Sequence, residues 1–502
     1  MKTPAWVKNF AGKILGAGYD ATQSSDMRPM AYNRGARPVD EDNQIGSWDR
    51  ARLRLECRDL RRNNPIVAGV CDRFSDNVVG PGVVPQAKTV DGKWNDAAEQ
   101  FFGEWAKVAD YRQRVSLRGL QKHIVQEWLV SGEMFFVLTD GGQLQPIEAD
   151  RVISPPNKSQ KEGVIDGIQI SPTGIPIGYY VGSRDESGIV QPDSIEYIRR
   201  ADMIHCYRPT RPDQLRGIPA LAPIITSLRD HGMLIHSMLQ RAKLEARPGL
   251  VIKSPEGARK MNNLGPRNAT ANSTQTQART EYIDDAQLFY LKKDEDIFSP
   301  AMNTPNAQFG TFNDVILRLV SSALSLPYEF LLLYFSGGSF SSNKAALAQT
   351  YKTFLGLYTD LNECFNQRTW NWRIAKAIRA GALAAAPIDA RGISEWYKVE
   401  WSQPDYTWID PDAGADVAIK EWNLGVGSVT SFARKRGRDG EDVLAEKGRD
   451  IATAQRIADE VNKASGTNLT WRDLISTLQP GQTAPSSASD APAKNINEEA
   501  IK

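Results

Sequence analysis

The sequence predicts an α+β fold in which long helices interrupt a mixed body of helices and short strands. Apolar residues recur every three or four positions in three stretches, which is typical of helices with one buried face. These stretches lie at about 219–246, 306–325 and 345–365. Between about 133 and 207, short apolar runs alternate with glycine- and proline-containing turns, which indicates strands. A chain of 502 residues is long enough for roughly two to four domains.

Composition and charge narrow the class of protein. Hydrophobic residues make up 41% and charged residues 24%, as in soluble globular proteins. Lys plus Arg is 61 and Asp plus Glu is 60, so the net charge is +1. This balance argues against a protein that holds nucleic acid tightly, because such proteins carry a basic excess. This charge balance remains compatible with a protein that contacts nucleic acid only transiently.

Cysteine and histidine usage indicates neither a disulfide framework nor a metal centre, and we expect no cofactor. The cysteines have no CxxC spacing and are expected to be reduced, buried thiols in a cytoplasmic setting. They are Cys57, Cys71, Cys206 and Cys364. The histidines are too scattered for a metal site; they are His123, His205, His231 and His236.

No membrane segment is expected. The start, MKTPAWVKNFAGKILGAGYD, has too little continuous apolar length for a signal peptide, and either a short amphipathic helix or a loosely ordered arm is compatible with it. The most apolar stretch, 317–335, contains Arg318, Pro327 and Glu329, which a lone membrane span would tolerate poorly. We interpret it as a buried helix and the segment that follows.

In the first half of the chain, residues 1–48 are polar and irregular. Helices begin in SWDRARLRLECRDLRRNNPIVAGVCDRFSDNVVG, with a break at Asn63-Asn64-Pro65, and are next expected in WNDAAEQFFGEWAKVAD and SLRGLQKHIVQEWLVSGE. The stretch MFFVLTDGGQLQPIEADRV predicts a hairpin, because two apolar strands flank an Asp-Gly-Gly turn. Further short strands continue to about Tyr207.

In the second half, RPGLVIKS and EYIDDAQLFYLKKDEDI predict strands on either side of a polar stretch, 256–280, that is expected to be loop or partly disordered. The cleanest helical spacing in the chain follows 345, and its apolar positions are Leu347, Tyr351, Phe354, Tyr358, Leu361 and Phe365. GISEWYKVEWSQPDYTWIDP is strand-like, helices are expected from Asp412, and the tail from about Gln479 is expected to be disordered.

The stretch LLLYFSGGSFSSNKAAL, residues 331–347, invites comparison with a nucleotide-binding loop. A Walker A loop needs G-x-x-x-x-G-K-[ST] after a strand, so that backbone amides surround the phosphates and a hydroxyl reaches magnesium. Here no glycine stands directly before Lys344, and Ala345 stands where the hydroxyl residue belongs. A P-loop-like, nucleotide-dependent DNA-handling enzyme is therefore only the alternative hypothesis.

Other candidate sites are weaker, and we expect no catalytic residues. His205 and Cys206 are adjacent in a predicted strand, so their side chains should face opposite sides of the sheet. The acidic groups Asp284-Asp285 and Asp294-Glu295-Asp296 are typical of solvated turns. The basic run Arg434-Lys435-Arg436-Gly437-Arg438 could contact phosphate, but a solvated helix start is favoured.

Lys344 itself has two interpretations. It should lie in the first turn of a helix capped by Ser341 or Ser342, where a cation is disfavoured by up to about 1 kcal/mol. It is either a surface lysine without a role, or a cation that meets anions together with the helix N-terminus.

Several segments, in collinear order over about 45–465, resemble the lambda-type portal proteins of tailed bacteriophages. They are RARLRLECRDLRRNNPIVAGVCDRFSDNVVGPG, GEMFFVL with LQPIEADRV, IHCYRPTRPDQLRGIPALAPII, SSALSLPYEFLLLYFSGGSFSSNKAAL, WSQPDYTWIDPDAGADVAIKEWNLGVGSVT and GRDGEDVLAEKG. None of them is a catalytic signature.

The resemblance implies a portal fold with wing, stem, clip and crown that assembles as a dodecameric ring. The implied division is a flexible N-terminal arm (1–48), a first wing part (49–218), stem helix 1 (219–246), a clip (247–305), stem helix 2 (306–327), a tunnel loop (328–344), a second wing part (345–427), a crown (428–478) and a disordered tail (479–502). The implied DNA-facing residues of the tunnel loop are Phe335, Ser336, Gly337, Gly338, Ser339, Phe340, Ser341, Ser342, Asn343 and Lys344.

The resemblance also implies function and partners. The ring would sit at one capsid vertex as the channel for packaging and ejecting double-stranded DNA, which it would contact transiently and without sequence preference. It would dock the terminase large subunit and head-tail adaptor proteins, contact major capsid and scaffold proteins, and be assembled in the host cytoplasm. No membrane partner is implied.

Overall fold

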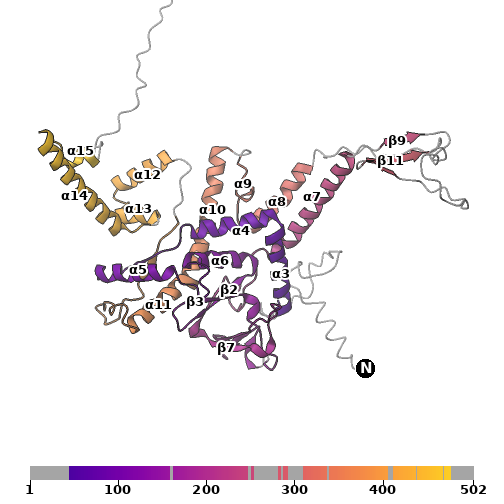
Figure 1. Ribbon diagram of the computed structural model, residues 1–502, viewed down its shortest axis with the longest axis horizontal. Coiled ribbons are helices and arrows are strands. Elements are labelled where there is room, and N and C mark those ends of the chain that lie inside the picture. Colours follow the sequence, from indigo (N-terminus) through magenta and orange to yellow (C-terminus); the bar gives the residue numbers. More distant parts are fainter. Residues whose placement is uncertain are drawn as a thin grey trace, which may run out of the picture. The chain divides into compact units, whose positions relative to one another are not determined.

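The structure is a computed structural model of the whole chain, shown in Figure 1. It describes residues 45–158, 162–246, 250–253, 281–283, 286–291, 309–335, 339–404, 411–436, 438–466 and 468–475. The chain divides into two compact units, each treated by itself below. The first comprises Met1–Gly82 and Ala87–Val399, and the second comprises Val83–Gln86 and Glu400–Lys502. Helices and sheets are mixed throughout the first unit, which confirms the predicted α+β class.

The first two described helices are separated at the predicted break. Helix α3 (Ser47–Asn63) ends at Asn64, whose side chain accepts hydrogen bonds from the backbone amides of Ile66 and Val67 at 3.0 and 3.3 Å. Helix α4 (Pro65–Val79) begins with the proline at its first position. Proline has no amide hydrogen to satisfy there and Asn64 satisfies the next two, so the local sequence both ends one helix and starts the other.

The two helices that follow also match the prediction. Helix α5 (Gly92–Ala106) is capped by Asp91, and helix α6 (Leu117–Val130) follows Ser116. Both bury one apolar stripe, and α6 contacts α4. Helix α6 also contacts β2 (Glu133–Leu138), whereas α5 contacts α11 (Gln367–Arg379), as Figure 1 shows.

The predicted hairpin is the centre of a three-stranded antiparallel sheet. Strands β2 (Glu133–Leu138) and β3 (Leu144–Ile147) pair with Leu138 opposite Leu144, and β8 (Met203–Tyr207) pairs with the other edge of β2. In β2, Phe135 and Phe136 are both fully buried, on opposite faces. A central strand covered on both faces explains why its sequence is continuously apolar.

A four-stranded antiparallel sheet lies between β3 and β8 in the chain. Its order is β4-β5-β6-β7, with bounds Val164–Ile165, Ile168–Ile170, Pro176–Val181 and Glu196–Arg199. Its buried side chains and those of the first sheet form one apolar cluster that includes Phe135, Ile168, Tyr179 and Met203. The short turns η2 (Ala149–Arg151) and η5 (Arg200–Asp202) connect the two sheets.

Two helices bracket a small group of strands, as the sequence predicts, although both helices are shorter than expected. Helix α7 spans Ile225–Ala246 rather than 219–246, because Pro219 and Pro223 favour a turn and the short 3-10 helix η6 (Ala222–Ile224) before it. Helix α8 is described over Phe309–Ala323, and it contacts α7. Residues 324–327, assigned to the same stem helix, instead form a turn in which Ser325 has φ +54°.

Between α7 and α8, the structure describes three strands. They are β9 (Leu250–Lys253), β10 (Glu281–Ile283) and β11 (Ala286–Leu291). β11 is parallel to β9 and antiparallel to β10. The strands confirm the prediction for RPGLVIKS and EYIDDAQLFYL, whereas 256–280 and both acidic groups, Asp284-Asp285 and Asp294-Glu295-Asp296, lie outside the described residues.

The cleanest helical pattern forms a nearly continuous helix. α9 (Tyr328–Leu332) precedes it, then α10 (Phe340–Leu361) runs through one π-helical turn, η8 (Asn362–Asn366), into α11 (Gln367–Arg379). Four of its predicted apolar positions are buried: Phe354, Tyr358, Leu361 and Phe365. Inside η8, Asn366 accepts a buried hydrogen bond from Gln121 of α6 at 2.9 Å.

The second unit is mostly helical in its described part. The only strand described from GISEWYKVEWSQPDYTWIDP is β12 (Val399–Trp401), which pairs with β1 (Pro85–Ala87). The helices expected from Asp412 are α12 (Pro411–Asn423), α13 (Val429–Lys435), α14 (Gly440–Ser465) and α15 (Trp471–Ile475). The tail from Gln479 and the N-terminal residues up to 44 lie outside the described residues.

The cysteines are free, with Cys57, Cys71 and Cys206 buried and Cys364 half-buried. Within the described ranges, no helix is both long and apolar enough to cross a membrane. The same ranges contain no cluster of His, Cys, Asp and Glu suited to a metal ion.

Candidate nucleic-acid interface

The stretch that the sequence singles out lies between α8 and α10 and is held at its start by α9. Tyr328, the first residue of α9, donates its hydroxyl to the Asp314 carboxylate of α8 at 2.7 Å. Arg73 of α4 donates from Nη2 to the carbonyl oxygen of Leu331 at 2.7 Å. Helix α9 is therefore fixed to two other helices although it has only five residues.

The far side of the segment is anchored by aromatic packing. Phe354 of α10 lies between Phe330 of α9 and Phe74 of α4, with ring centroids 5.6 and 5.3 Å away. Thr353 donates its hydroxyl to the carbonyl oxygen of Ser325 at 3.1 Å. Together these contacts hold both ends of the segment on the body.

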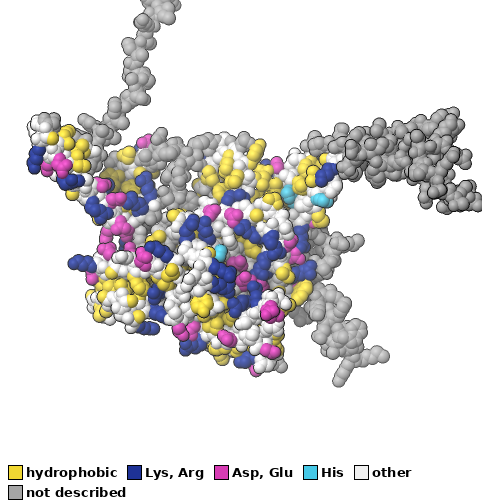
Figure 2. All heavy atoms as spheres, in the orientation of Figure 1, with side chains coloured by type: hydrophobic (Ala, Val, Ile, Leu, Met, Phe, Trp, Pro, Cys, Tyr) yellow, Lys and Arg dark blue, Asp and Glu magenta, His cyan; other side chains and the backbone are white. Residues whose placement is uncertain are grey.

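Beyond α9 the chain turns outward. Leu333 adopts a left-handed conformation with φ +55°, and the amide of Tyr334 donates to the carbonyl of Glu329 at 3.0 Å. Leu333 and Tyr334 are 59% and 58% exposed. Figure 2 shows hydrophobic side chains gathered on the surface around α8, α9 and α10, where these residues lie.

Two side chains define where the next helix starts. Ser339 caps α10 by accepting the amide of Ser342 at 3.3 Å, and Asn343 donates from Nδ2 to the carbonyl oxygen of Phe335 at 3.1 Å. The cap was expected at Ser341 or Ser342, which is wrong. All three serines can cap, but only Ser339 has the extended backbone that a cap residue needs, with φ −71° and ψ 156°.

The predicted tunnel loop, 328–344, is thus loop only in its middle. Its first five residues are α9, and Phe340, Ser341, Ser342, Asn343 and Lys344 belong to α10. Phe335 is 37% exposed, while Ser336, Gly337 and Gly338 lie outside the described residues. The loop prediction does not hold at either end, because an aromatic segment at one end and a serine-capped turn at the other form helix. The glycines of this stretch do not indicate either helical end.

Lys344 lies in the second turn of α10 rather than the first, because the helix begins at Phe340. It is half-buried and interacts within the chain. The field of the helix N-terminus falls off within the first turn, so the expected conflict between this cation and the helix dipole is small. The segment before α10 is helix α9 rather than a strand, which removes the strand–loop–helix context of a nucleotide-binding loop.

A buried charge network surrounds Glu133 in the first unit, and no local sequence pattern predicts it. Glu133, at the start of β2, accepts hydrogen bonds from Arg216 Nε at 2.8 Å, from the Gly217 amide at 2.8 Å and from His205 Nε2 at 3.0 Å. Glu133 and Arg216 are fully buried. Although burial raises the pKa of a carboxyl, the Arg216 and His205 contacts hold the pKa of Glu133 well below its usual range.

A close backbone approach positions this network. Gly132 has φ +85°, and a Cβ atom there would lie 2.4 Å from the carbonyl carbon of Ile218. At Gly217 a Cβ atom would lie 2.2 Å from the carbonyl oxygen of Gly132. Only glycine fits at these two positions, so the two backbone segments approach closely enough for Arg216 to reach Glu133.

The network continues to the surface through helix α3. Arg50, Arg54 and Arg58 lie one turn apart, and they contact Asp166, Asp150 and Asp150 respectively. Their spacing of four residues is visible in RARLRLECRDLRR and indicates that the three arginines share one face of the helix. The carboxylates come from residues about a hundred positions away, which no local spacing indicates.

His205 and Cys206 face opposite sides of β8, as predicted. The His205 ring stacks on Phe135 with centroids 4.1 Å apart and contacts Glu133, whereas Cys206 faces Cys364, whose thiol pKa is raised mainly by burial and also by that contact. Of the basic run at 434–438, Arg436 and Arg438 are exposed near the end of α13, and Arg438 pairs with Glu446. The ion pair agrees with a solvated helix start.

A family profile described as phage portal protein, lambda family, matches residues 28–357. Curated relatives include the portal protein of Escherichia phage N15, 21% identical over 476 residues that cover 83% of this chain and 87% of the relative. Portal protein B of Escherichia phage lambda is 21% identical over 448 residues, covering 78% and 82%. A probable portal protein of Halomonas phage phiHAP-1 is 25% identical over 449 residues, covering 80% of each.

Solved structures with a similar chain include the neck of an empty GTA particle, with a TM-score of 0.44 and 14% identity, covering 80% of this chain and 96% of that chain. The virion of a native gene transfer agent particle has a TM-score of 0.42 and 14% identity, covering 84% and 94%.

Proposed function

Because this chain belongs to the lambda family of phage portal proteins, it is a portal vertex subunit, and we propose that it forms a dodecameric ring whose channel passes double-stranded DNA. The family match over residues 28–357 is the observation that carries this function. The family is a structural one, and we propose no catalytic role.

Support for a ring comes from helix α8. Leu317 and Val320 are buried on one side, while Phe312, Val315 and Leu319 form a stripe on the other at helical spacing, 49–61% exposed. A stripe of large apolar side chains costs free energy in water, by about 25 cal/mol per Å² of apolar surface. A neighbouring copy in a ring would cover it.

Support for a DNA contact comes from the segment after α9. Its exposed tip, Leu333–Phe335, is held between two anchored helices, and the sequence from 330 to 344 contains no acidic residue. A channel must let DNA slide, so it needs few of the strong, salt-dependent phosphate contacts that a basic lining gives. Ring symmetry would multiply Lys344 into a circle of charges, so that one residue per subunit suffices.

The other parts follow the same scheme. We assign α7 and α8 to the stem, β9–β11 to the clip, α10 and α11 to the wing, and α13–α15 to the crown. The clip would dock the terminase large subunit and the head-tail adaptors, and capsid and scaffold proteins would surround the ring, which assembles in the host cytoplasm before its incorporation in the virion.

Electron microscopy of the purified full chain tests this proposal. Negative-stain images should show rings of uniform size, and the preparation should not hydrolyse ATP by itself. A chain that stays monomeric at high concentration would contradict the ring, and intrinsic ATPase activity would favour the alternative enzyme.

A further inference from the structure

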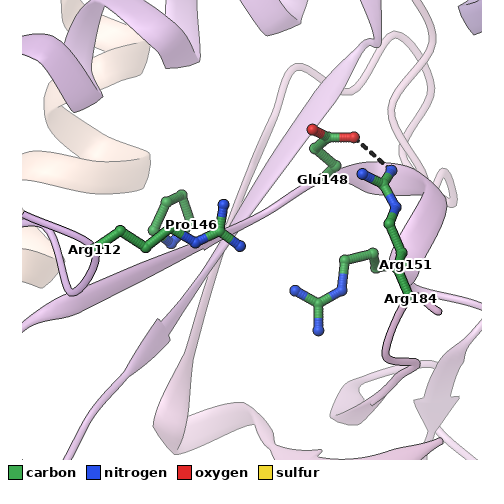
Figure 3. Close-up of a pocket in the computed structure, with 5 residues that line it drawn as sticks. All are labelled: Arg112, Pro146, Glu148, Arg151 and Arg184. Atoms are coloured by element: carbon green, nitrogen blue, oxygen red, sulfur yellow. Dashed lines mark hydrogen bonds and ion pairs between the residues drawn. The ribbon is translucent and has the colours of Figure 1, made fainter. Parts of the chain in front are cut away.

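A small cavity in the body, away from α8–α10 in the sequence, gathers three arginines. It has a volume of about 260 Å³ and is lined by Arg112, Pro146, Glu148, Arg151 and Arg184 (Figure 3). Nothing in the proposed channel function uses these residues. The cavity lies in the first unit and draws on three separate parts of the chain.

Single β-bridges bring those parts together. Asp110 pairs with Leu144, which places the loop of Arg112 beside β3. Val152 pairs with Val181, which places Arg151 beside the residues after β6. Arg184 is itself bridged to Val190 across a tight turn. The three guanidinium groups therefore project from backbone that is held by pairing rather than from free loops.

Further hydrogen bonds fix the backbone at Arg112 and Arg151. The buried carboxylate of Asp110 accepts the amides of Arg112 and Arg114 at 3.1 and 3.0 Å, which shapes the loop. Arg151 donates from Nε to the carbonyl of Gly182 at 2.8 Å, and the Gly182 amide donates back to the Arg151 carbonyl at 2.8 Å. Backbone geometry at both residues is thus set before any ligand arrives.

Donors remain available inside the cavity. Arg184 is engaged, since its Nη2 lies 2.6 Å from Glu148 Oε2. For the Nη atoms of Arg151 and the guanidinium of Arg112, the described part of the chain supplies no hydrogen-bond acceptor. Figure 3 shows these two guanidinium groups pointing into one space, while Arg184 turns toward Glu148.

The cavity is short of negative charge. Its lining carries three guanidinium groups and one carboxylate, and Glu148 is shared with Arg58 at 3.9 Å. Burial first, and then the neighbouring Arg112 and Arg184 guanidinium groups, lower the pKa of Arg151 despite opposing effects of Glu148 and Glu196. An anion between Arg112 and Arg151 would relieve this repulsion.

Size and donor geometry point to the kind of anion. The volume is below the roughly 300–1,000 Å³ of pockets for drug-sized ligands, so the ligand is small or is a small group of a larger molecule. Arginine forks match the oxygens of phosphate with paired hydrogen bonds. We propose that this cavity binds a phosphate group, held by Arg112 and Arg151, with Arg184 and Glu148 completing the wall.

The phosphate could be a free ion or part of a nucleic acid, and the experiment separates these sources. The purified full chain is titrated calorimetrically, at fixed ionic strength, with inorganic phosphate, with pyrophosphate, with a short DNA duplex and with glutamate. Saturable binding of phosphate or pyrophosphate is expected. If the duplex competes for the same site, the source is DNA; if it does not, the source is a free ion.

Two variants from one loop make the test specific. Arg112→Gln removes a cavity donor whose side chain makes no hydrogen bond to the described residues, and it should weaken phosphate binding about tenfold, or about 1.4 kcal/mol. Arg114→Gln removes the same charge from the same loop but not from the cavity lining, and it should leave the affinity within about twofold. Arg151→Lys keeps the charge but loses the fork and should also weaken binding.

Three results would overturn the site: no saturable phosphate binding up to about 10 mM, equal losses in Arg112→Gln and Arg114→Gln, or glutamate binding as tightly as phosphate. The ring assembly of each variant is followed by electron microscopy. Loss of phosphate binding with intact rings would separate this site from the portal function.

Discussion

The side-chain amide of Asn343 donates a hydrogen bond to the carbonyl oxygen of Phe335, 3.1 Å away, and so joins the first turns of α10 to the chain that leaves α9. The bond thus joins the two ends of the segment that is proposed to face DNA. Asn343→Ala should raise amide exchange at Phe335 and Ser339 about fivefold, because a typical hydrogen bond is worth about 1 kcal/mol. Hydrogen exchange with mass spectrometry measures this.

For this first variant, Gln349→Ala is the matched control, since Gln349 is exposed on the same helix. It should leave exchange unchanged. Equal exchange in Asn343→Ala and the parent chain would show that the contact does not organise the segment.

Replacing Lys344 by Gln together with Ser341→Ala should reduce packaged or retained DNA severalfold without preventing ring assembly. Both residues lie at the start of α10, next to the proposed channel surface. A packaging assay scored beside negative-stain images measures both outcomes. Lys352→Gln, an exposed lysine two turns further along α10, should package normally. Loss of rings would instead make the segment a packing element.

Polar substitutions on the exposed stripe of α8 should block assembly of the ring. Phe312→Ser with Leu319→Ser removes two large apolar side chains that are 56% and 61% exposed in the single chain. Because they are exposed, the subunit should keep its circular dichroism spectrum while light scattering reports monomers. Ile189→Ser, which changes a 63% exposed side chain in the β6–β7 turn, is the control and should still form rings. Assembly of the double variant would remove α8 from the interface.

Glu133→Gln should lower the free energy of unfolding by about 3 kcal/mol, because the buried Arg216 guanidinium then keeps only the Asp166 carboxylate, 3.3 Å away. Glutamine keeps the size of the side chain, so the loss reports charge rather than volume. Urea denaturation measures it. Glu104→Gln changes an exposed carboxylate on α5 and should cost less than about 1 kcal/mol. Similar losses in both variants would contradict the role of the network.

Stability should decrease as the pH falls below about 6.5. Burial is the largest effect on His205 and lowers its pKa against the opposing contact with Glu133; Arg216 and Arg368 lower it further. A histidine with a lowered folded-state pKa takes up its proton more readily when unfolded, so acid favours the unfolded chain. The depressed pKa of Glu133 acts in the same direction at lower pH.

Urea midpoints between pH 8 and pH 5.5 test the histidine effect. His205→Gln should reduce the slope of stability against pH in this window. His236→Gln, at an exposed position of α7, is the matched control. An unchanged slope in His205→Gln would assign the pH dependence to other groups.

The sequence by itself determined the elements whose signals repeat locally. The Asn64-Pro65 break between α3 and α4, the Asp-Gly-Gly hairpin of β2 and β3, and the apolar spacing of α10 were all predicted and are confirmed. Each signal lies within one element, where the period of 3.6 or 2 residues and the chemistry of caps and turns decide the conformation.

Only the tertiary structure decided the capping of α10 by Ser339, the pairing of Glu133 with Arg216, and the meeting of Arg112 with Arg151. Three serines are equivalent candidates for the cap of α10. The first of them caps the helix, and Phe354 of the same helix packs between α4 and α9. Glu133 and Arg216 are 83 residues apart, and they meet because two glycines let the backbones approach. Such contacts depend on how whole elements pack, which no local period records.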